Sequence, residues 1–360
     1  MKITFILPCV YATGGIRVVV THAKHLMEKG HEVFIIAPQP TRKSLLRSFE
    51  SFFKQGIFSL HDFYDPTYFE LNQVPYTLSR HSSVRVDDVP DADVIIATWW
   101  ETAEWIANFP PEKGKKIYFI QHHETIIDKE NLERVKATYE LPFQKITISR
   151  WLIELLLNEY SDKSAFLVPN SVDMELFFAE PRIKNPIPKV GFMYSDLFWK
   201  GADICLATIQ QVKALIPNLT VTCFSYEPIS AEIPLLKDID LHLRPAQHQL
   251  RHLYASCDVW LCGSRAEGFG LPVLEAMACR CPVVSVRTGG APDLITPGTN
   301  GFLLPPGDTD GLAHYVIKIL QLSNLEWQSM SNAAYQTATR YTWKDAADQL
   351  ESALIKTLST

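Results

Sequence analysis

The 360-residue sequence lacks features that mark several large classes of protein. It has no uninterrupted run of about 18 apolar residues, so nothing in it predicts a membrane-spanning helix. Its 34 basic and 40 acidic residues give a formal charge of −6, and no basic field exists to hold a nucleic-acid backbone. Hydrophobic residues make up 47%, a globular composition that excludes wholesale disorder. We therefore expect a globular protein with no transmembrane helix and no nucleic-acid partner.

The cysteines argue against a disulfide framework or a zinc ribbon. Their number, seven, is odd, and no Cys-x-x-Cys pair occurs among positions 9, 205, 223, 257, 262, 279 and 281. Small buried hydrophobes in a reducing cytoplasm account for all of them. The short apolar run at Met1–Pro8 ends at a proline and predicts a first buried strand rather than a signal peptide. We therefore expect a cytoplasmic protein.

Short apolar runs alternate with helix-like segments along both halves of the chain. Runs that are apolar on both faces and alternate with helices predict parallel sheets covered on both sides. The predicted strands are Ile3–Leu7, Val33–Ala37, Val94–Thr98, Ile117–Gln121, Ile146–Ser149, Phe166–Val168, Val190–Met193, Val221–Ser225, Leu241–Leu243, Val259–Cys262 and Val283–Val286. Because the alternation occurs twice, we expect an α/β protein with two doubly wound, Rossmann-like domains. Their ligand crevice should lie at the carboxyl ends of the strands.

Three segments set the expected domain boundaries. The stretch Glu180–Pro188 has three prolines and little periodicity, which predicts a linker between a first domain at 1–180 and a second at 186–342. Residues 343–360 have apolar side chains at helical spacing and predict a closing helix. Residues 40–90 are rich in aromatic side chains, break the alternation and predict a divergent insertion beside the first sheet.

The stretch Ser264–Ala278, SRAEGFGLPVLEAMA, carries the strongest functional signal. It follows a predicted strand, and Gly268 and Gly270 let the backbone turn tightly and approach a ligand. The proline suits the first turn of a helix, whose free N–H groups and dipole favour a phosphate or diphosphate. Glu267 and Glu275 can face the crevice, where a carboxylate accepts hydrogen bonds from the hydroxyls of a ribose or hexose. Either glutamate alone would more simply complement the helix dipole, so the prediction depends on the whole string.

This string resembles the signature of the retaining glycosyltransferases of family 4, which have the GT-B fold. The resemblance continues through CPVV at 281–284, GGAPDLI at 289–295 and GFLLPPGD at 301–308. Upstream, PNSVD at 169–173 resembles the family's segment between its two domains. The match is close from residue 169 to residue 308 and loose before it. It implies two Rossmann-like domains that face each other across a cleft, with the C-terminal helix closing back.

The resemblance also implies roles for residues of the second domain. Glu275 would hold the ribose of the nucleotide, and Glu267 would contact hydroxyls of the donor sugar. The glycine turn would contact the sugar and the diphosphate through Gly268, Phe269, Gly270 and Leu271. Lys200 matches a lysine that neutralises the leaving diphosphate, and an ammonium there stabilises charge that develops in the transition state. An ordinary solvated lysine before a helix is the alternative for Lys200.

Two positions depart from the family's pattern. The family has an arginine in the strand before the lysine, where it grips the diphosphate, and this chain has Phe192 there. Either Arg17, Arg244 or Arg265 replaces this cation, or the diphosphate is held more weakly. At Arg280 the family commonly has glycine, and the sequence alone gives no reason for the arginine.

In the first half, Gly14 and Gly15 follow the first predicted strand and open a helix. Glycines there let backbone amides face the crevice, although a tight strand–helix turn explains them as well. The resemblance places this loop over the donor diphosphate, near the acceptor. It also implies a functional histidine at the end of the strand Lys116–Ile120, for which we choose His122, with His123 as the alternative.

Metal binding is the weaker interpretation of this histidine pair. Adjacent residues of an extended segment point to opposite faces, so His122 and His123 do not easily hold one ion. Three Asp-x-Asp strings, at 91–93, 238–240 and 308–310, precede strands or lie in a loop and are interpreted as solvated turns. We expect no required metal, no separate cofactor, and a nucleotide-diphosphate sugar as donor substrate.

Residues 42–54 place Leu45, Phe49, Phe52 and Phe53 on one helical face, flanked by basic side chains. A basic aromatic helix can lie on an anionic membrane, and an amphipathic helix packed on its own domain is the alternative. Peripheral contact with the inner membrane face through this segment would suit a lipid-linked acceptor.

The resemblance implies a metal-independent hexosyltransferase that moves a sugar from a nucleotide sugar to an acceptor hydroxyl with retention at the anomeric carbon. Polysaccharide, glycolipid or cell-surface glycan synthesis would supply the acceptor. The catalytic candidates are His122, Glu267 and Lys200. Three alternatives stay open: a nucleotide-sugar epimerase of GT-B-like fold, a non-catalytic nucleotide-sugar-binding subunit, and a Rossmann oxidoreductase, which the missing dinucleotide fingerprint disfavours.

Overall fold

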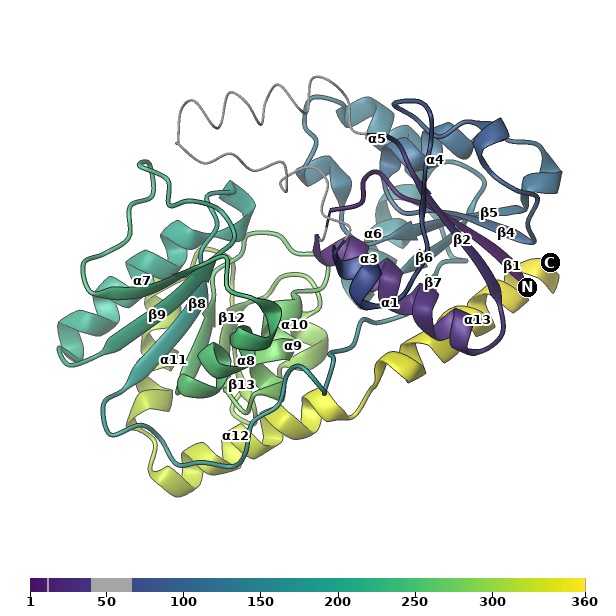
Figure 1. The fold of residues 1–360 in the computed structure, drawn as a ribbon. Helices are drawn as coiled ribbons and strands as arrows, with labels where there is room; N and C mark the ends of the chain where they lie inside the picture. Colours follow the sequence, from purple (N-terminus) through teal and green to yellow (C-terminus); the bar gives the residue numbers. More distant parts are fainter. Residues whose placement is uncertain (12, 40–66, 360) are drawn as a thin grey trace. The chain divides into compact units, whose positions relative to one another are not determined.

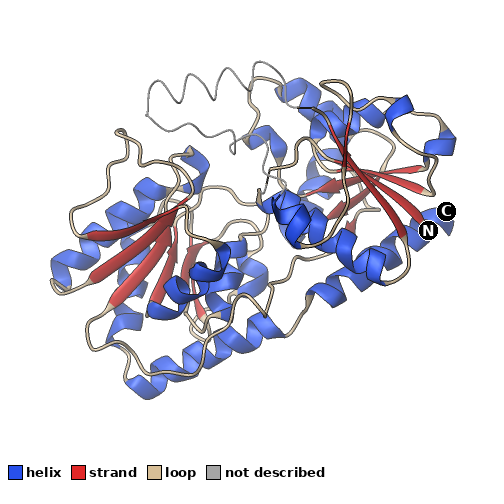
Figure 2. Ribbon diagram, viewed as in Figure 1, coloured by secondary structure: helices blue, strands red, loops and turns tan. Residues whose placement is uncertain are grey.

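The computed structural model describes residues 1–11, 13–39 and 67–359. The chain divides into two compact units, Met1–Asn170 with Trp343–Thr360, and Ser171–Thr342. Each unit holds one parallel sheet flanked by helices (Figures 1 and 2), which confirms the expected pair of Rossmann-like domains. The segment 42–54, considered above for membrane contact, lies outside the described residues. Among those residues, no helix combines the length and the apolar character that a bilayer crossing requires.

The first unit is built on a seven-stranded parallel sheet of order β3-β2-β1-β4-β5-β6-β7. Its strands are β1 (Lys2–Ile6), β2 (Glu32–Ala37), β3 (Thr77–Leu78), β4 (Val94–Ala97), β5 (Lys115–Ile120), β6 (Gln144–Thr147) and β7 (Phe166–Leu167). Its helices are α1 (Gly14–Glu28), α3 (Thr67–Leu71), α4 (Trp100–Ile106), α5 (Leu132–Tyr139), α6 (Arg150–Tyr160) and α13 (Trp343–Ser359), with single 3-10 turns at η2 (Val86–Asp88), η3 (Pro111–Lys113) and η4 (Glu124–Ile126). The strand order reverses between β1 and β4, where doubly wound sheets bind ligands.

The second unit repeats this plan with a six-stranded parallel sheet of order β10-β9-β8-β11-β12-β13. Its strands are β8 (Lys189–Met193), β9 (Thr220–Ser225), β10 (Ile239–Leu243), β11 (Val259–Cys262), β12 (Val283–Val286) and β13 (Gly301–Leu304). Its helices are α7 (Ala202–Leu215), α8 (Gln247–Ser256), α9 (Leu271–Ala278), α10 (Ala291–Leu294), α11 (Thr309–Gln321) and α12 (Asn324–Thr339), with the 3-10 turn η5 (Phe198–Lys200). Here the strand order reverses between β8 and β11.

Residues 180–188, which were predicted to link the two domains, pack on the second unit. The chain passes between units at Asn170–Ser171, upstream of residues 180–186. Within that stretch, the Arg182 guanidinium donates hydrogen bonds to the carbonyl of Ala255 at 2.9 Å and to the Asp258 carboxylate at 3.1 Å. It also lies over the ring of Trp327, 4.5 Å from the centroid. These contacts fix an extended, proline-rich segment to the surface of the unit.

Helix α13 returns to the first unit and packs against α1 (Figure 1). At its first residue, Trp343 makes an edge contact with the buried imidazole of His22, whose ring centroid lies 5.5 Å away. Burial lowers the pKa of His22 to about 3, so this imidazole is neutral at pH 7. Further along, Lys29 and His31 pair with Glu351, with His31 Nε2 at 2.7 Å from the carboxylate. The expected closing helix over 343–360 is therefore present as an integral part of the first unit.

Two features of the fold were not predicted from the sequence. The strands β3 and β13 are absent from the predicted set: β3 has two residues, and β13 begins at Gly301, a residue type that strands disfavour. Pairing with β12 decides the strand conformation, because Gly301 faces Val283 and a Cβ there would lie 2.1 Å from its carbonyl oxygen.

The structure also accounts for Arg280. This residue has a positive φ of 60°, a conformation that glycine adopts without strain, at the turn that follows α9. Its guanidinium donates to the carbonyl of Ala179 at 2.8 Å and to Asn332 at 2.6 Å, and lies over the ring of Tyr335. These contacts offset the backbone strain and secure α12 beside α9.

The packing of α13 predicts a clear difference between two of its aliphatic side chains. Leu350 is fully buried, so Leu350→Ala should lower the free energy of unfolding by about 2–5 kcal/mol, because it leaves a cavity. Ile355 on the same helix is 50% exposed, and Ile355→Ala should change it by no more than about 0.5 kcal/mol. Urea unfolding of both variants measures this; equal losses would contradict the described packing of α13.

Candidate functional site

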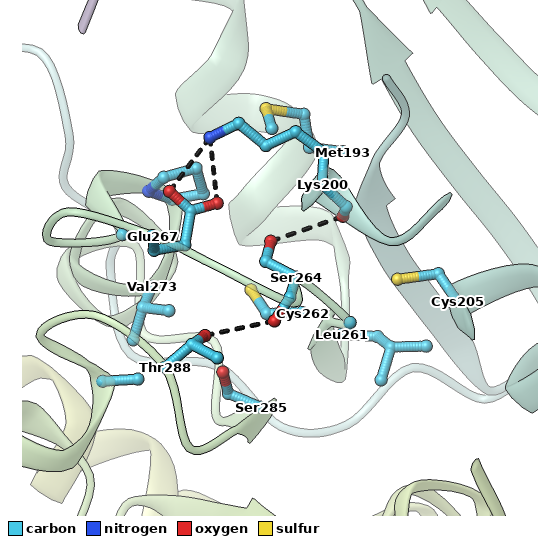
Figure 3. A pocket seen from close by; sticks show the side chains of 14 residues that line it. Met193, Lys200, Cys205, Leu261, Cys262, Ser264, Glu267, Val273, Ser285 and Thr288 are labelled. Carbon is cyan, nitrogen blue, oxygen red and sulfur yellow. Dashed lines mark hydrogen bonds and ion pairs between the residues drawn. The ribbon is translucent and has the colours of Figure 1, made fainter. Parts of the chain in front are cut away.

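A pocket in the second unit lies at the carboxyl edge of its sheet (Figure 3). The residues that line it lie at or just after the ends of β8, β11 and β12 and include Met193, Lys200, Cys262, Glu267, Gly270 and Thr288. Because β8 and β11 are the strands between which the order reverses, the pocket occupies the position at which doubly wound sheets bind ligands. Of the site residues predicted from the sequence, this pocket brings together Lys200, Glu267 and Gly270.

Lys200 and Glu267 form an ion pair at the rim of this pocket. The ammonium nitrogen Nζ lies 2.9 Å from each carboxylate oxygen, and the two side chains are 24% and 14% exposed. Figure 3 shows the lysine reaching across from η5 to the loop that precedes α9. Because the pair is largely removed from solvent, its attraction is stronger than that of an exposed surface pair.

Glycines permit the loops around the pair to touch backbone to backbone. Gly201 has a φ of 65°, and a Cβ there would lie 2.0 Å from the carbonyl oxygen of Gly263. A Cβ at Gly289 would lie 2.7 Å from the Cβ of Glu267. The carbonyl of Trp199 accepts hydrogen bonds from the amides of residues 265 and 266, at 2.8 and 3.2 Å. The positions of Lys200 and Glu267 are therefore fixed by their backbones.

The glycine turn leads directly into α9. Gly270 has a φ of 90° and precedes Leu271, the first residue of the helix. Gly268 and Phe269 are buried, and the carbonyl of Phe269 accepts a hydrogen bond from the amide of Gly290 at 2.8 Å. This loop therefore presents backbone rather than the Phe269 side chain at the start of α9.

Glu275 lies further along α9 and is not among the residues that line the pocket. Its carboxylate accepts a hydrogen bond from the hydroxyl of Tyr254 on α8, at 2.7 Å. Tyr254 is fully buried, with its ring 4.4 Å from that of Trp260. Sequence reasoning missed Tyr254; the available signal was a tyrosine on the helix before β11, the strand whose end carries the glycine turn.

The cation absent at Phe192 is not restored by Arg265. Phe192 is buried in the core of the sheet, beside Gly191, where a Cβ would lie 2.3 Å from the Trp260 ring. The Arg265 guanidinium donates two hydrogen bonds to Asp203, at 2.8 and 2.6 Å, and lies over the ring of Phe198. Among the residues described as lining the pocket, Lys200 is the only lysine or arginine; Arg17 and Arg244 do not line it.

The two thiols of the pocket are protonated at neutral pH. Burial raises the pKa of Cys205 to about 12. Burial also raises the pKa of Cys262 well above its ordinary value, with further contributions from Cys205 and Glu267. Neither cysteine is therefore a ready nucleophile, since the thiolate is the reactive form.

In the first unit, the predicted residues gather at the carboxyl ends of β1 and β5. Thr13 caps α1 by accepting a hydrogen bond from the amide of Ile16 at 3.3 Å, so Gly14 and Gly15 form its first turn. A Cβ at Gly15 would lie 3.4 Å from the side-chain amide nitrogen of Gln121, the residue before His122. The helix start and the end of β5 are thus immediate neighbours.

His122 and His123 lie in the turn that follows β5. The Nδ1 atom of His122 lies 3.2 Å from the carbonyl oxygen of His123, and His123 Nε2 lies 2.8 Å from the hydroxyl of Thr125. Burial lowers the pKa of His123. Within the described part of the chain, no three His, Cys, Asp or Glu side chains converge as metal ligands.

The buried residue Glu124 stabilises this turn through hydrogen bonds with two tyrosines. Its side chain accepts a hydrogen bond from the Tyr118 hydroxyl at 2.5 Å, and its amide donates to the hydroxyl of Tyr139 at 3.0 Å. Tyr139 in turn donates to the carbonyl of His122 at 3.2 Å. Glu124, Tyr118 and Tyr139 were not predicted from the sequence, although it shows a glutamate next to the histidine pair and a tyrosine on the helix that follows.

The comparisons with known proteins match the part of the chain that holds this pocket. Residues 176–337 match the family of glycosyl transferases group 1. The matched segment contains Lys200, Glu267 and Glu275 and covers nearly all of the second unit. It is the part of the chain in which the glycine turn and the ion pair are found.

Curated relatives match the chain in part. The N-acetyl-alpha-D-glucosaminyl L-malate synthase of Bacillus anthracis is 43% identical over 75 residues, which are 21% of this chain and 20% of that protein. The GtfA subunit of the UDP-N-acetylglucosamine–peptide N-acetylglucosaminyltransferase of Streptococcus gordonii is 30% identical over 206 residues, 53% of this chain and 40% of that protein. The chain therefore spans well under two thirds of the length of these relatives.

Solved structures match the chain from end to end. HepE of Anabaena, solved in complex with UDP-glucose, has a TM-score of 0.75 at 18% identity, covering 100% of this chain and 99% of that one. Sucrose-phosphate synthase of Thermosynechococcus elongatus has a TM-score of 0.73 at 16% identity, covering 99% and 98%. At these identities the likeness shows the fold, which is GT-B.

The burial of Glu124 predicts a pH dependence of stability. Burial raises its pKa to about 8 from an ordinary 4.5, against smaller lowering by hydrogen bonds from Tyr118 and the Trp100 backbone. The folded chain then keeps a proton that the unfolded chain releases, so the contribution of Glu124 is fully present below pH 4.5 and is lost as the pH rises through 8.

Glu124→Gln mimics the protonated carboxyl and should remove this loss. Wild type and variant should therefore melt at similar temperatures near pH 5, and the variant should become the more stable of the two towards pH 8.5. Thermal unfolding of both proteins across this range is the measurement. A difference in melting temperature that stays constant with pH would show that Glu124 does not hold its proton.

Proposed function

We propose that this chain is a glycosyltransferase that uses a nucleotide-diphosphate sugar as donor. The observation that carries the proposal is the Lys200–Glu267 pair at the rim of a pocket at the carboxyl ends of parallel strands, within the segment that matches the group 1 family. A nucleotide sugar has a diphosphate bonded directly to a hydroxylated sugar. A cation beside a carboxylate suits it, because the cation can bind the diphosphate and the carboxylate can accept hydrogen bonds from the sugar hydroxyls. HepE, which shares the fold, was solved with UDP-glucose.

In this proposal each candidate site residue of the second unit binds one part of the donor. The Lys200 ammonium binds the diphosphate and stabilises the charge that develops there as the sugar leaves. The amides of the turn Gly268–Leu271 and the start of α9 add to this binding through their N–H groups. Glu267 accepts hydrogen bonds from sugar hydroxyls, and Glu275, oriented by Tyr254, accepts them from the ribose.

The finer assignment is a retaining hexosyltransferase of family 4 that requires no metal. The support for it is the EGFGLPVLEAMA string and the protonated state of both pocket thiols, which removes them as nucleophiles. The leaving diphosphate would then accept the proton of the acceptor hydroxyl on the face from which it departs. The protein would contribute orientation and charge stabilisation.

The first unit supplies the remaining candidates. His122 is proposed to contact the donor sugar, and the turn at Gly14–Gly15 to present backbone amides to the donor. For the acceptor we propose a glycan or a lipid-linked hydroxyl, in polysaccharide, glycolipid or cell-surface glycan synthesis. A cytoplasmic location with peripheral membrane contact through residues 42–54 belongs to the same proposal.

Binding of nucleoside diphosphates tests the proposed donor site. Among UDP, GDP, ADP, dTDP and NAD, tested in EDTA, a nucleoside diphosphate should raise the melting temperature of the wild type. Lys200→Ala and Glu275→Ala should each weaken its binding by at least about tenfold, because a charged hydrogen bond contributes about 1.5–3 kcal/mol. Titration calorimetry measures both losses.

Lys237→Ala and Glu232→Ala are the matched controls, since they remove the same charges from exposed positions of the same unit. They should bind like the wild type. If NAD alone stabilises the protein, or if Lys200→Ala and Glu275→Ala bind like the wild type, the site assignment is wrong.

A further inference from the structure

The Lys200–Glu267 pair is supported by contacts of the protein's own backbone. Its partners sit on backbones that are already fixed: the amide of Lys200 donates to the carbonyl of Leu197 at 2.8 Å, and its own carbonyl accepts from the Ser264 hydroxyl at 3.3 Å. On the other side, Gly289 packs against the Cβ of Glu267. Both oxygens of the carboxylate are 2.9 Å from Nζ, so the carboxylate occupies the ammonium group from one side (Figure 3).

This arrangement matters because the described lining of the pocket holds no second lysine or arginine. Lys200 is the only basic side chain among its described lining residues, and Arg265 is held by Asp203. A diphosphate that reaches Lys200 therefore meets an ammonium group whose charge Glu267 already balances. It also meets the carboxylate itself, a like charge about 3 Å from the same nitrogen.

We propose that Glu267 is a built-in competitor of the donor's diphosphate for Lys200, and that the donor's sugar is what releases it. This inference rests on the proposed function. When a nucleotide sugar binds, Lys200 turns to the diphosphate, and the sugar hydroxyls donate to Glu267 in place of the ammonium group. A nucleoside diphosphate without the sugar has no hydroxyl group that can donate a hydrogen bond to Glu267. When it binds Lys200, the Glu267 carboxylate therefore loses its partner and gains none.

The pair therefore discriminates between donor and product. When the nucleotide sugar binds, the hydrogen bonds between Lys200 and Glu267 are replaced by bonds from Lys200 to the diphosphate and from the sugar hydroxyls to Glu267. Once the sugar has been transferred, the product diphosphate has no hydroxyls left to bind Glu267. Glu267 then returns to Lys200 and displaces the product. In this account Glu267 lowers the affinity for the product and raises the affinity for the donor, and so favours product release.

The proposal predicts that neutralising Glu267 changes the affinities for UDP and for UDP-glucose in opposite directions. Glu267→Gln keeps the shape of the side chain and removes its charge, so it should bind UDP about tenfold more tightly than the wild type, the gain expected when one charged contact is freed. It should bind UDP-glucose more weakly, because an amide accepts hydroxyl hydrogen bonds less well than a carboxylate. Titration calorimetry with UDP and UDP-glucose, and with GDP and GDP-mannose, measures both on the full chain.

Two further comparisons show whether a gain in UDP affinity comes from breaking the Lys200–Glu267 pair or from the loss of any negative charge. In a Lys200→Met background, Glu267→Gln should give no gain in UDP affinity, because the competition needs the ammonium group. Asp240→Asn removes one negative charge from an exposed pair with His242 on β10 and should leave UDP binding unchanged. If Glu267→Gln does not fold, Glu267→Ser supplies a second neutral side chain and should show the same gain.

The outcomes distinguish this inference from the proposed function. If the wild type binds UDP or GDP but the neutral variants bind it no better, the competition does not exist while the donor site stands. The same conclusion follows if the gain survives in the Lys200→Met background. If the wild type binds none of UDP, GDP, ADP and dTDP, the proposed function itself fails.

Discussion

The contact between the backbones of Gly201 and Gly263 is the constraint on which the site depends. A Cβ at Gly201 would lie 2.0 Å from the carbonyl oxygen of Gly263, so only glycine lets η5 lie this close to the loop after β11. This approach carries Lys200 to Glu267, one side chain from each loop. Gly289 closes the arrangement from the third strand end, against the Cβ of Glu267. Loops after β8, β11 and β12 thus meet at a point where parallel strands end together.

The two units use their strand ends differently. In the second unit, Lys200 and Glu267 at the pocket rim are charged and balance each other. In the first unit the turn after β5 is held by a neutral network, because burial keeps the proton on Glu124 and two tyrosines complete its hydrogen bonds. The pocket of the second unit therefore has a charged pair at its rim, whereas neutral hydrogen bonds hold the His122 turn of the first unit.

The sequence was sufficient to predict the repeated α/β plan, because strands buried on both faces are read directly from apolar runs. Local strings of residues also singled out Lys200 and Glu267, which the structure places beside each other in one pocket. The sequence could not show that they pair, since 67 residues separate them and only the sheet order brings β8 beside β11. Phe192 is explained by the core in which it packs, and Arg280 by partners 52 and 101 residues away. Contacts of that range leave no local pattern.

We expect Lys200 to leave Glu267 for the diphosphate of a nucleotide sugar. A crystal structure of the wild type with UDP-glucose tests this most directly, because it shows all the partners at once. We expect a diphosphate oxygen within hydrogen-bond distance of Lys200 Nζ, sugar hydroxyls on Glu267, and a lengthened distance between the two side chains. A bound nucleotide that leaves the 2.9 Å pair intact, or that lies away from this pocket, would contradict the claim.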